Sequence, residues 1–236
     1  MTATTYHVSY LGVVFDLDGT LVESRHDFRT MRAAVKSLAE KAGIPPGELH
    51  TTMAIPQIMA YTMDRLRQLG LSDGVRYKFE ADANRLLDDM ELKALPTTKI
   101  RAGSVPFLER LSGEGYRLGL LTRSSARFTE QVLHGTGLRP LFRAVRTRSD
   151  PGPSKPDPEA LLRLLKEMMA PPDRAVYVGD HPLDLECAIA ARVDFIGLVH
   201  PSPPGPKGAE EELRRRGARV VVRSFEDLRH AITGQT

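Results

Sequence analysis

The chain has few of the features that mark secreted, disulfide-bonded or membrane proteins. Its 236 residues include one cysteine and no tryptophan. A single cysteine, Cys187, cannot form an intramolecular disulfide, so nothing indicates an oxidising compartment. No uninterrupted apolar stretch is long enough to span a bilayer, and no basic segment followed by an apolar core opens the chain. We therefore expect a cytoplasmic protein that does not bind membranes.

An excess of one charge sign is also missing. The formal net charge is +3, with 33 Lys and Arg against 30 Asp and Glu. Aromatic residues make up 6% of the chain, and no basic stretch is interleaved with them. This weak positive balance suits a small anionic substrate and predicts no nucleic-acid partner. Nothing in the pattern indicates an oligomeric state.

The most informative segment is a short apolar run that ends in two carboxylates. Residues 13–15 precede Asp16 and Asp18, and Gly-Thr follows. Two acids at i and i+2 concentrate negative charge, which is tolerable only where a cation or hydrogen-bond donors lie near. A strand followed by an Asx turn would account for Asp-Gly alone. Because strand ends in an open α/β sheet form the ligand site, we expect both acids to point into it.

Three later segments carry reactive side chains in comparable places. Thr122 and Arg123 follow an apolar run, and Lys155 lies in a proline-braced loop before a helical pattern. Asp180 and Asp184 follow another buried-strand pattern. Each has an ordinary alternative, since a Thr or Asp after a strand is often a helix N-cap and a lone lysine is usually exposed. Their shared placement at strand ends predicts a common site.

Strand and helix patterns alternate over most of the chain. Strands are predicted near 8–16, 117–121, 144–147, 175–179, 195–199 and 219–222, and helices near 104–111, 126–134 and 159–169. This alternation predicts a Rossmann-like α/β fold, in which helices cover both faces of a parallel sheet.

One segment departs from the alternation, because only helical periods occur in it. Apolar residues recur at helical spacing in three blocks, the first of which places Phe28 on its apolar face. We therefore predict two domains: an α/β core of residues 1–22 and 97–236, and an all-helical cap of residues 23–96 inserted after the first strand.

Together these segments resemble the four motifs of the haloacid dehalogenase-like hydrolase superfamily, whose members are mostly phosphatases. The motifs match in chain order at Asp16-x-Asp18-Gly-Thr, Thr122, Lys155 and Gly-Asp180-x-x-x-Asp184. The helical insert is similar to a C1 cap, and the opening 21–24 resembles the phosphoglycolate phosphatase branch. Two positions depart from the pattern: His181 stands where many relatives have a small polar residue, and Arg123 where Asn is frequent.

The resemblance implies a mechanism and a cofactor. Asp16 would be the nucleophile that forms a phospho-aspartate, and Asp18 the general acid and base. The implied cofactor is Mg²⁺, a hard cation that prefers oxygen ligands. Asp16 and Asp180 would bind it by side chain and Asp18 by its backbone carbonyl, with Asp184 in contact with these ligands or reaching the metal through water.

Substrate recognition is assigned to the basic and hydroxyl residues. Thr122, Lys155 and Arg123 are expected to bind the phosphate of a small phosphorylated metabolite. Arg25, Arg32 and Arg123 are candidates to recognise a carboxylate or second phosphate, because guanidinium pairs with both in a bidentate way. Arg123 is preferred because it adjoins Thr122 at a strand end.

Several functions are compatible with these motifs. A Mg²⁺-dependent phosphatase, a phosphoric monoester hydrolase acting on a phosphoglycolate-like compound, is the leading hypothesis. A dehalogenase is disfavoured by Asp18, since halide displacement needs no acid and that subfamily lacks this residue. A sugar-phosphate mutase of the β-phosphoglucomutase type shares all four motifs and differs chiefly in its cap. A non-catalytic ligand-binding module of the same fold is disfavoured by the intact acids and Lys155.

Overall fold

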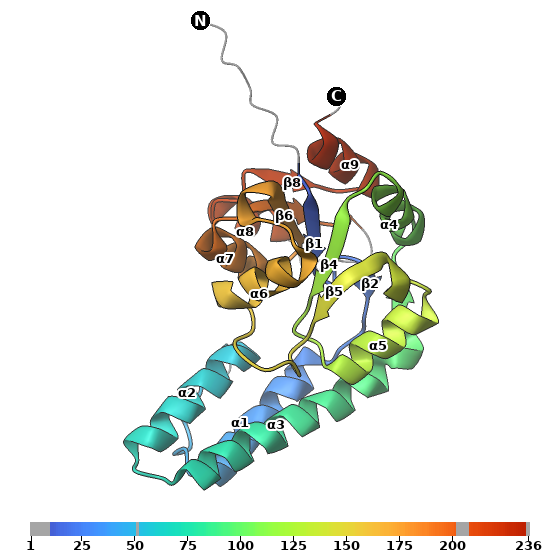
Figure 1. The fold of residues 1–236 in the computed structure, drawn as a ribbon. Helices are drawn as coiled ribbons and strands as arrows, with labels where there is room; N and C mark the ends of the chain where they lie inside the picture. The colour runs from blue at the N-terminus through green and yellow to red at the C-terminus, as the bar shows by residue number, and fades with distance from the viewer. Residues whose placement is uncertain (1–9, 51, 202–207, 235–236) are drawn as a thin grey trace, which may run out of the picture. The chain divides into compact units, whose positions relative to one another are not determined.

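The computed structural model describes residues 10–50, 52–201 and 208–234. The chain forms two compact units, Met1–Ser24 with Thr97–Thr236, and Arg25–Pro96 (Figure 1). Within the described ranges, no helix is both long enough and apolar enough to cross a lipid bilayer.

The larger unit is built on a six-stranded parallel sheet in the order β5-β4-β1-β6-β7-β8. Its strands are β1 (Gly12–Phe15), β4 (Arg117–Leu121), β5 (Phe142–Arg146), β6 (Ala175–Gly179), β7 (Asp194–Leu198) and β8 (Val220–Val222). Val14 of β1 lies opposite Gly119 of β4 on one side and Tyr177 of β6 on the other. The strand that precedes the paired acids is therefore central in the sheet.

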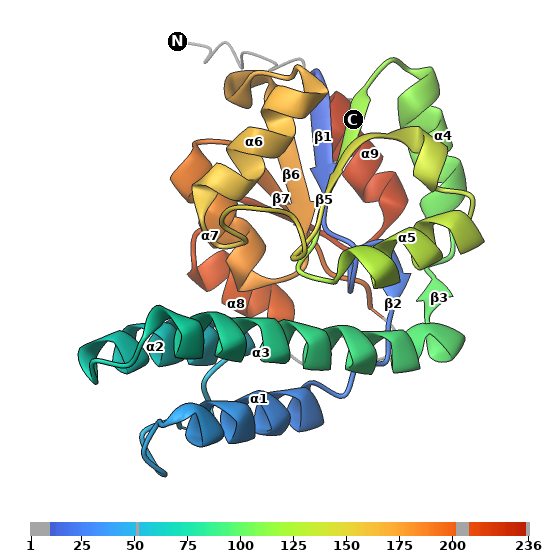
Figure 2. The same ribbon diagram turned by 60° about the horizontal axis from the view of Figure 1, so that its bottom comes forward.

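Helices cover both faces of this sheet, as predicted (Figures 1 and 2). They are α4 (Ser104–Gly113), α5 (Ala126–Gly135), α6 (Pro158–Met168), α7 (Pro182–Ala191), α8 (Ala209–Arg215) and α9 (Phe225–Thr233), with 3-10 turns η1 (Leu95–Thr97), η2 (Arg139–Leu141) and η3 (Pro172–Arg174). Alternation along β1 separates the faces. Val14 packs in a cluster with Met168 of α6 and Ala188 of α7, whereas Phe15 meets Phe107 of α4 edge-to-face.

Local sequence sets the ends of α6, the helix that follows the Lys155 loop. Asp157 caps its first turn by accepting a hydrogen bond from the Glu159 amide at 2.9 Å, and Pro158 occupies the first helical position. Met169 ends the helix in the left-handed conformation. The cap and the following proline therefore fix where the chain leaves the Lys155 loop.

The smaller unit is a three-helix assembly with a hydrophobic core of its own. It contains α1 (Phe28–Ala42), α2 (Ile55–Gln68) and α3 (Asp73–Ala94). Val35, Leu66 and Leu87, one from each helix, are buried in one cluster. The three predicted helices are present, but Phe28 is 54% exposed, so the buried face of α1 begins at Met31.

Two short strands were missing from the sequence prediction. β2 (Val22–Glu23) pairs antiparallel with β3 (Lys99–Ile100), in the two segments that connect the units. Two-residue strands carry no periodicity, so no pattern could indicate them. The first predicted strand, 8–16, begins later than expected, because β1 starts at Gly12. The third, 144–147, begins earlier, because β5 starts at Phe142. Positions 8 and 9 of the predicted first strand lie outside the described residues.

Candidate active site

The carboxyl end of β1 turns back sharply on itself. The Asp16 amide donates to the Val178 carbonyl at 2.9 Å and so continues the pairing with β6. Gly19 then adopts a φ of +88°, and a Cβ at this position would overlap the Asp180 carboxylate. The hydroxyl of Thr20 donates to Oδ1 of Asp180 at 3.2 Å. The turn thus brings the tips of β1 and β6 together.

Lys155 is buried between two acids, so the surface-lysine alternative does not hold. Its side chain is 4% exposed. Nζ donates to Oδ1 of Asp16 at 2.6 Å and to Oδ1 of Asp184 at 2.7 Å. A buried ammonium requires such partners, because an unpaired charge in the protein interior is strongly destabilising. Removing one partner of a buried ion pair typically lowers the free energy of unfolding by about 3–5 kcal/mol.

Asp184 stands in the first turn of α7, where it also takes part in capping. Its Oδ2 accepts from the His181 amide at 3.1 Å, and Nδ1 of His181 accepts from the Leu183 amide at 3.1 Å. Oδ1 of Asp184 accepts from the Tyr177 hydroxyl at 2.9 Å in addition to Lys155. Both oxygens of this carboxylate are therefore engaged by protein donors.

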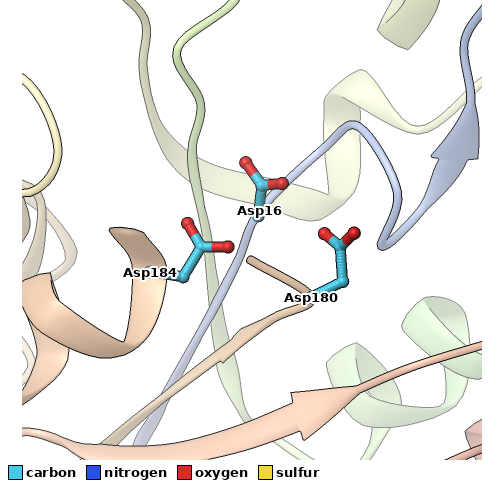
Figure 3. A group of neighbouring side chains, drawn as sticks. All are labelled: Asp16, Asp180 and Asp184. Atoms are coloured by element: carbon cyan, nitrogen blue, oxygen red, sulfur yellow. The ribbon is translucent and has the colours of Figure 1, made fainter. Parts of the chain in front are cut away.

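Three carboxylates converge at the ends of these elements (Figure 3). Oxygens of Asp16, Asp180 and Asp184 lie within 4.8 Å of one another. Asp16 directly follows β1, Asp180 directly follows β6, and Asp184 lies in the first turn of α7. The parallel pairing of β1 with β6 places their carboxyl ends side by side. An all-oxygen donor set of this kind suits a hard divalent cation such as Mg²⁺.

The electrostatics of the cluster fit a bound cation. Burial raises the pKa of Asp16 well above its usual range, against the opposing charge of Lys155. Burial and the charge of Asp184 raise the pKa of Asp180 to about 7. Burial lowers the pKa of Lys155, but Asp16 and Asp184 outweigh it and the net shift is upward, so this lysine stays charged. One ammonium among three carboxylates leaves the site short of positive charge, which a divalent cation would supply.

A second group of hydroxyls lies at the end of β4. The Ser124 amide donates to Oγ1 of Thr122 at 3.1 Å, and Oγ of Ser124 donates to Oδ2 of Asp18. Because the Thr122 oxygen accepts from this amide, its own proton can be directed to a ligand. Ser124 thus connects two predicted site residues.

Sequence reasoning did not single out Ser124 or Tyr177. Ser124 stands beside Ser125, whose hydroxyl caps α5 by accepting from the Phe128 amide at 3.3 Å, and serines just before a helix are typical of capping. Tyr177 is fully buried in β6. Its hydroxyl within an otherwise apolar strand is the sequence feature that could have indicated a buried hydrogen-bond partner.

The three arginines predicted to recognise the substrate lie in different units of the structure. Arg123 lies in the loop between β4 and α5, where its carbonyl accepts from Nε of Arg148 at 3.1 Å. Arg25 and Arg32 belong to the helical unit, Arg32 within α1. The acid cluster described above is formed within the α/β unit alone.

Comparison with known proteins agrees with this geometry. The family model described as haloacid dehalogenase-like hydrolase matches residues 10–192. Phosphoglycolate phosphatase 1 of Pseudomonas aeruginosa is 31% identical over 218 residues, which cover 92% of this chain and 77% of that protein. A phosphoglycolate phosphatase of Cereibacter sphaeroides is 31% identical over 185 residues, covering 78% of this chain and 83% of its own length.

Solved structures have the same fold. A hydrolase from Pseudomonas syringae matches with a TM-score of 0.62 at 22% identity, covering 95% of this chain and 99% of its own. A HAD family hydrolase from Deinococcus radiodurans matches with a TM-score of 0.61 at 22% identity, covering 96% of each chain. The matched family model spans residues 10–192 and so includes all three clustered acids, and the chain accordingly belongs to the haloacid dehalogenase-like hydrolases.

Proposed function

We propose that this enzyme is a Mg²⁺-dependent phosphatase that hydrolyses a small phosphorylated metabolite through a phospho-aspartate, with phosphoglycolate as the favoured substrate. One observation carries the proposal: Lys155 is buried in contact with Asp16 and Asp184, within a cluster of three carboxylates. Phosphoryl transfer requires a positioned nucleophile and positive charge around the phosphate oxygens, and this arrangement offers both. The two phosphoglycolate phosphatase relatives support the choice of substrate.

Asp16 is assigned as the nucleophile. A bond forms from its carboxylate oxygen to phosphorus as the bond from phosphorus to the alcohol oxygen breaks. Water then attacks the phosphorus of the aspartyl phosphate, which releases inorganic phosphate and restores the carboxylate. Lys155 orients Asp16 through the 2.6 Å hydrogen bond to Oδ1 and offsets part of the negative charge.

Asp18 is assigned as the acid and base of the two steps. It gives its proton to the departing alcohol and takes one from the attacking water. The hydrogen bond from Ser124 holds its carboxylate at the end of β4. Asp18 differs from Asp16 in its contacts, since Lys155 reaches Asp16 and a neutral hydroxyl reaches Asp18.

Thr122, Lys155 and Arg123 are assigned to the phosphate oxygens. Thr122 has its oxygen occupied by the Ser124 amide, which leaves its proton for the phosphate. Donors fixed before the substrate arrives stabilise developing charge without reorganisation.

The metal would be held by the side chains of Asp16 and Asp180 and by the backbone carbonyl of Asp18. Asp184 would lie next to these ligands without binding the metal directly, because both of its oxygens already accept hydrogen bonds from the protein. When bound, Mg²⁺ supplies the positive charge that neutralises the phosphate in the transition state.

The helical insert, residues 23–96, is proposed to act as a cap. Its three helices enclose a hydrophobic core of their own, separate from the sheet. A cap of this kind excludes water from the reaction and selects the alcohol part of the substrate.

The experiment is phosphate release from a panel of phosphorylated metabolites, with and without Mg²⁺, after treatment with EDTA. The panel includes phosphoglycolate, nucleoside monophosphates and hexose phosphates. Strong Mg²⁺-dependent release from phosphoglycolate, without any bisphosphate activator, is the expected result. Isomerisation of a hexose phosphate without net phosphate release would indicate a mutase instead, and activity that ignores EDTA would contradict the metal assignment.

A further inference from the structure

An arginine outside the four motifs is anchored by its backbone to the turn that follows β1. Arg101 occupies the connection between β3 and α4. Its amide donates to the Leu21 carbonyl at 3.0 Å, and its own carbonyl accepts from the Ser104 amide at 3.1 Å. The hydroxyl of Ser104 donates to the same Leu21 carbonyl at 3.0 Å. The backbone of Arg101 is therefore tied to the turn that follows Asp16 and Asp18.

The side chain of Arg101 is half-buried and incompletely paired. Its Nε is buried and has no hydrogen-bond partner among the residues that the structure describes. Burial lowers the pKa of Arg101, and the charges of Asp180 and Glu23 act in the opposite direction. A buried guanidinium donor without an acceptor is costly, which makes this Nε a candidate to bind a ligand.

The neighbours of Arg101 place it on one side of the cluster. Nε2 of His200, at the end of β7, donates to the Thr20 carbonyl at 3.0 Å, and Thr20 in turn donates to Asp180. Burial and the nearby charge of Arg101 lower the pKa of His200. Arg101 is therefore associated with the β6 and β7 side of β1, whereas Arg123 follows β4 on the other side.

We propose that Arg101 binds a second anionic group of the substrate, a carboxylate carried by the alcohol part of the phosphate ester. This proposal rests on the proposed phosphatase function. The phosphate is placed by Lys155 and Thr122, and the planar guanidinium of Arg101 offers a bidentate partner for a carboxylate. A carboxylate carries a single charge, which one guanidinium offsets. The preferred substrates are therefore phosphate esters of hydroxy acids.

A matched pair of substrates tests this assignment. Phosphoglycolate and ethyl phosphate differ by a carboxylate in place of a methyl group. Arg101→Gln is expected to lower kcat/KM for phosphoglycolate about 10- to 100-fold, the loss typical of a charge-assisted bidentate contact. The loss for ethyl phosphate is expected to be at least about 10-fold smaller, and the difference to appear mainly in KM. Arg101→Lys keeps the positive charge but cannot make the bidentate contact, so it should give an intermediate loss of kcat/KM for phosphoglycolate.

The control is Arg163→Gln, which removes an exposed guanidinium on α6 whose Nε pairs with Glu159. It should leave the preference between the two esters as in the wild type. The half-saturating Mg²⁺ concentration is measured for each variant, since a residue that only balances the charge of Asp180 would change metal binding and affect both esters equally.

Each other outcome would overturn the proposal in a distinct way. Equal losses on both esters, or no loss on either, would remove Arg101 as a carboxylate ligand. A selective loss of activity on phosphoglycolate in Arg123→Gln alone would show that Arg123 binds the carboxylate. A loss in Arg101→Gln confined to esters with a second phosphate would show that Arg101 binds a phosphate instead. A wild-type enzyme that releases phosphate from no ester would instead refute the proposed function. If Arg101→Gln does not fold, judged by its circular dichroism, Arg101→Lys carries the comparison.

Discussion

The α/β unit buries Asp16, Lys155 and Asp184 against its apolar strands, whereas the helical unit places its ion pairs near the surface. Apart from Thr62 and Glu91, the buried side chains described in the helical unit are apolar. Apolar burial stabilises a fold without specifying any chemistry. Buried charge is costly and persists where its partners compensate it, so its concentration at one end of the sheet indicates function there.

The largest expected effect comes from Asp16→Asn, because the change removes the nucleophile and keeps the size of the side chain. We expect kcat to fall by about 10³-fold or more, as for other nucleophile substitutions. Far-ultraviolet circular dichroism should match the wild type. The exposed Asp173 serves as the control, and Asp173→Asn should retain full activity. Activity of Asp16→Asn above a few per cent of wild type would exclude Asp16 as the nucleophile.

Lys155→Met tests the buried charges directly. Asp16 and Asp184 would lose their shared cation, and we expect the free energy of unfolding of the metal-free protein to fall by about 3–5 kcal/mol. Urea denaturation measures it. Mg²⁺ should stabilise the variant more than the wild type, because the uncompensated negative charge is larger. A decrease comparable to that of an exposed lysine substitution would show that the pair does not matter to stability.

The raised pKa of Asp180 predicts a pH dependence in the metal-free protein. Because the pKa is raised to about 7 by burial and by Asp184, the folded state binds a proton more tightly than the unfolded chain. The stability from this group is therefore present at low pH and is lost as pH rises through about 7. Thermal melting with EDTA should show a falling Tm between about pH 5 and about pH 8. Mg²⁺ should oppose the fall, since metal binding requires ionised carboxylates.

Asp180→Asn provides the control for this pH dependence. The variant removes the titrating carboxyl, so its Tm should vary less over the same pH range. A wild-type Tm that rises with pH in EDTA would contradict the sign of the shift.

The smallest effect is expected in the helical unit. Nε of Arg65 donates to Oε2 of Glu48 at 2.9 Å, and the Tyr61 hydroxyl donates to the same oxygen at 2.8 Å. Solvent screens this pair, so Arg65→Ala should lower the Tm far less than Lys155→Met does. High salt should reduce the difference further. A loss as large as that of Lys155→Met would show that charge matters equally in both units.

Much of the fold could be predicted because its signals are local. The apolar runs at β1 and β6 and the helical spacing of α1, α2 and α3 follow from the direction in which successive side chains point. The short ribbon of β2 and β3 and the exposure of Phe28 could not be predicted, because they depend on contacts with distant segments.

The sequence by itself determined which reactive residues the chain carries and that they follow strands, since residue type and periodicity are written along the chain. Only the tertiary structure decided which of them meet. Lys155 lies 139 residues from Asp16 and Ser124 lies 106 residues from Asp18, yet each pair is hydrogen-bonded. Arg101 could not be distinguished from an ordinary surface arginine until its buried Nε was seen. The physical reason is that burial and pairing arise from the packing of separate strands and loops, which no local pattern records.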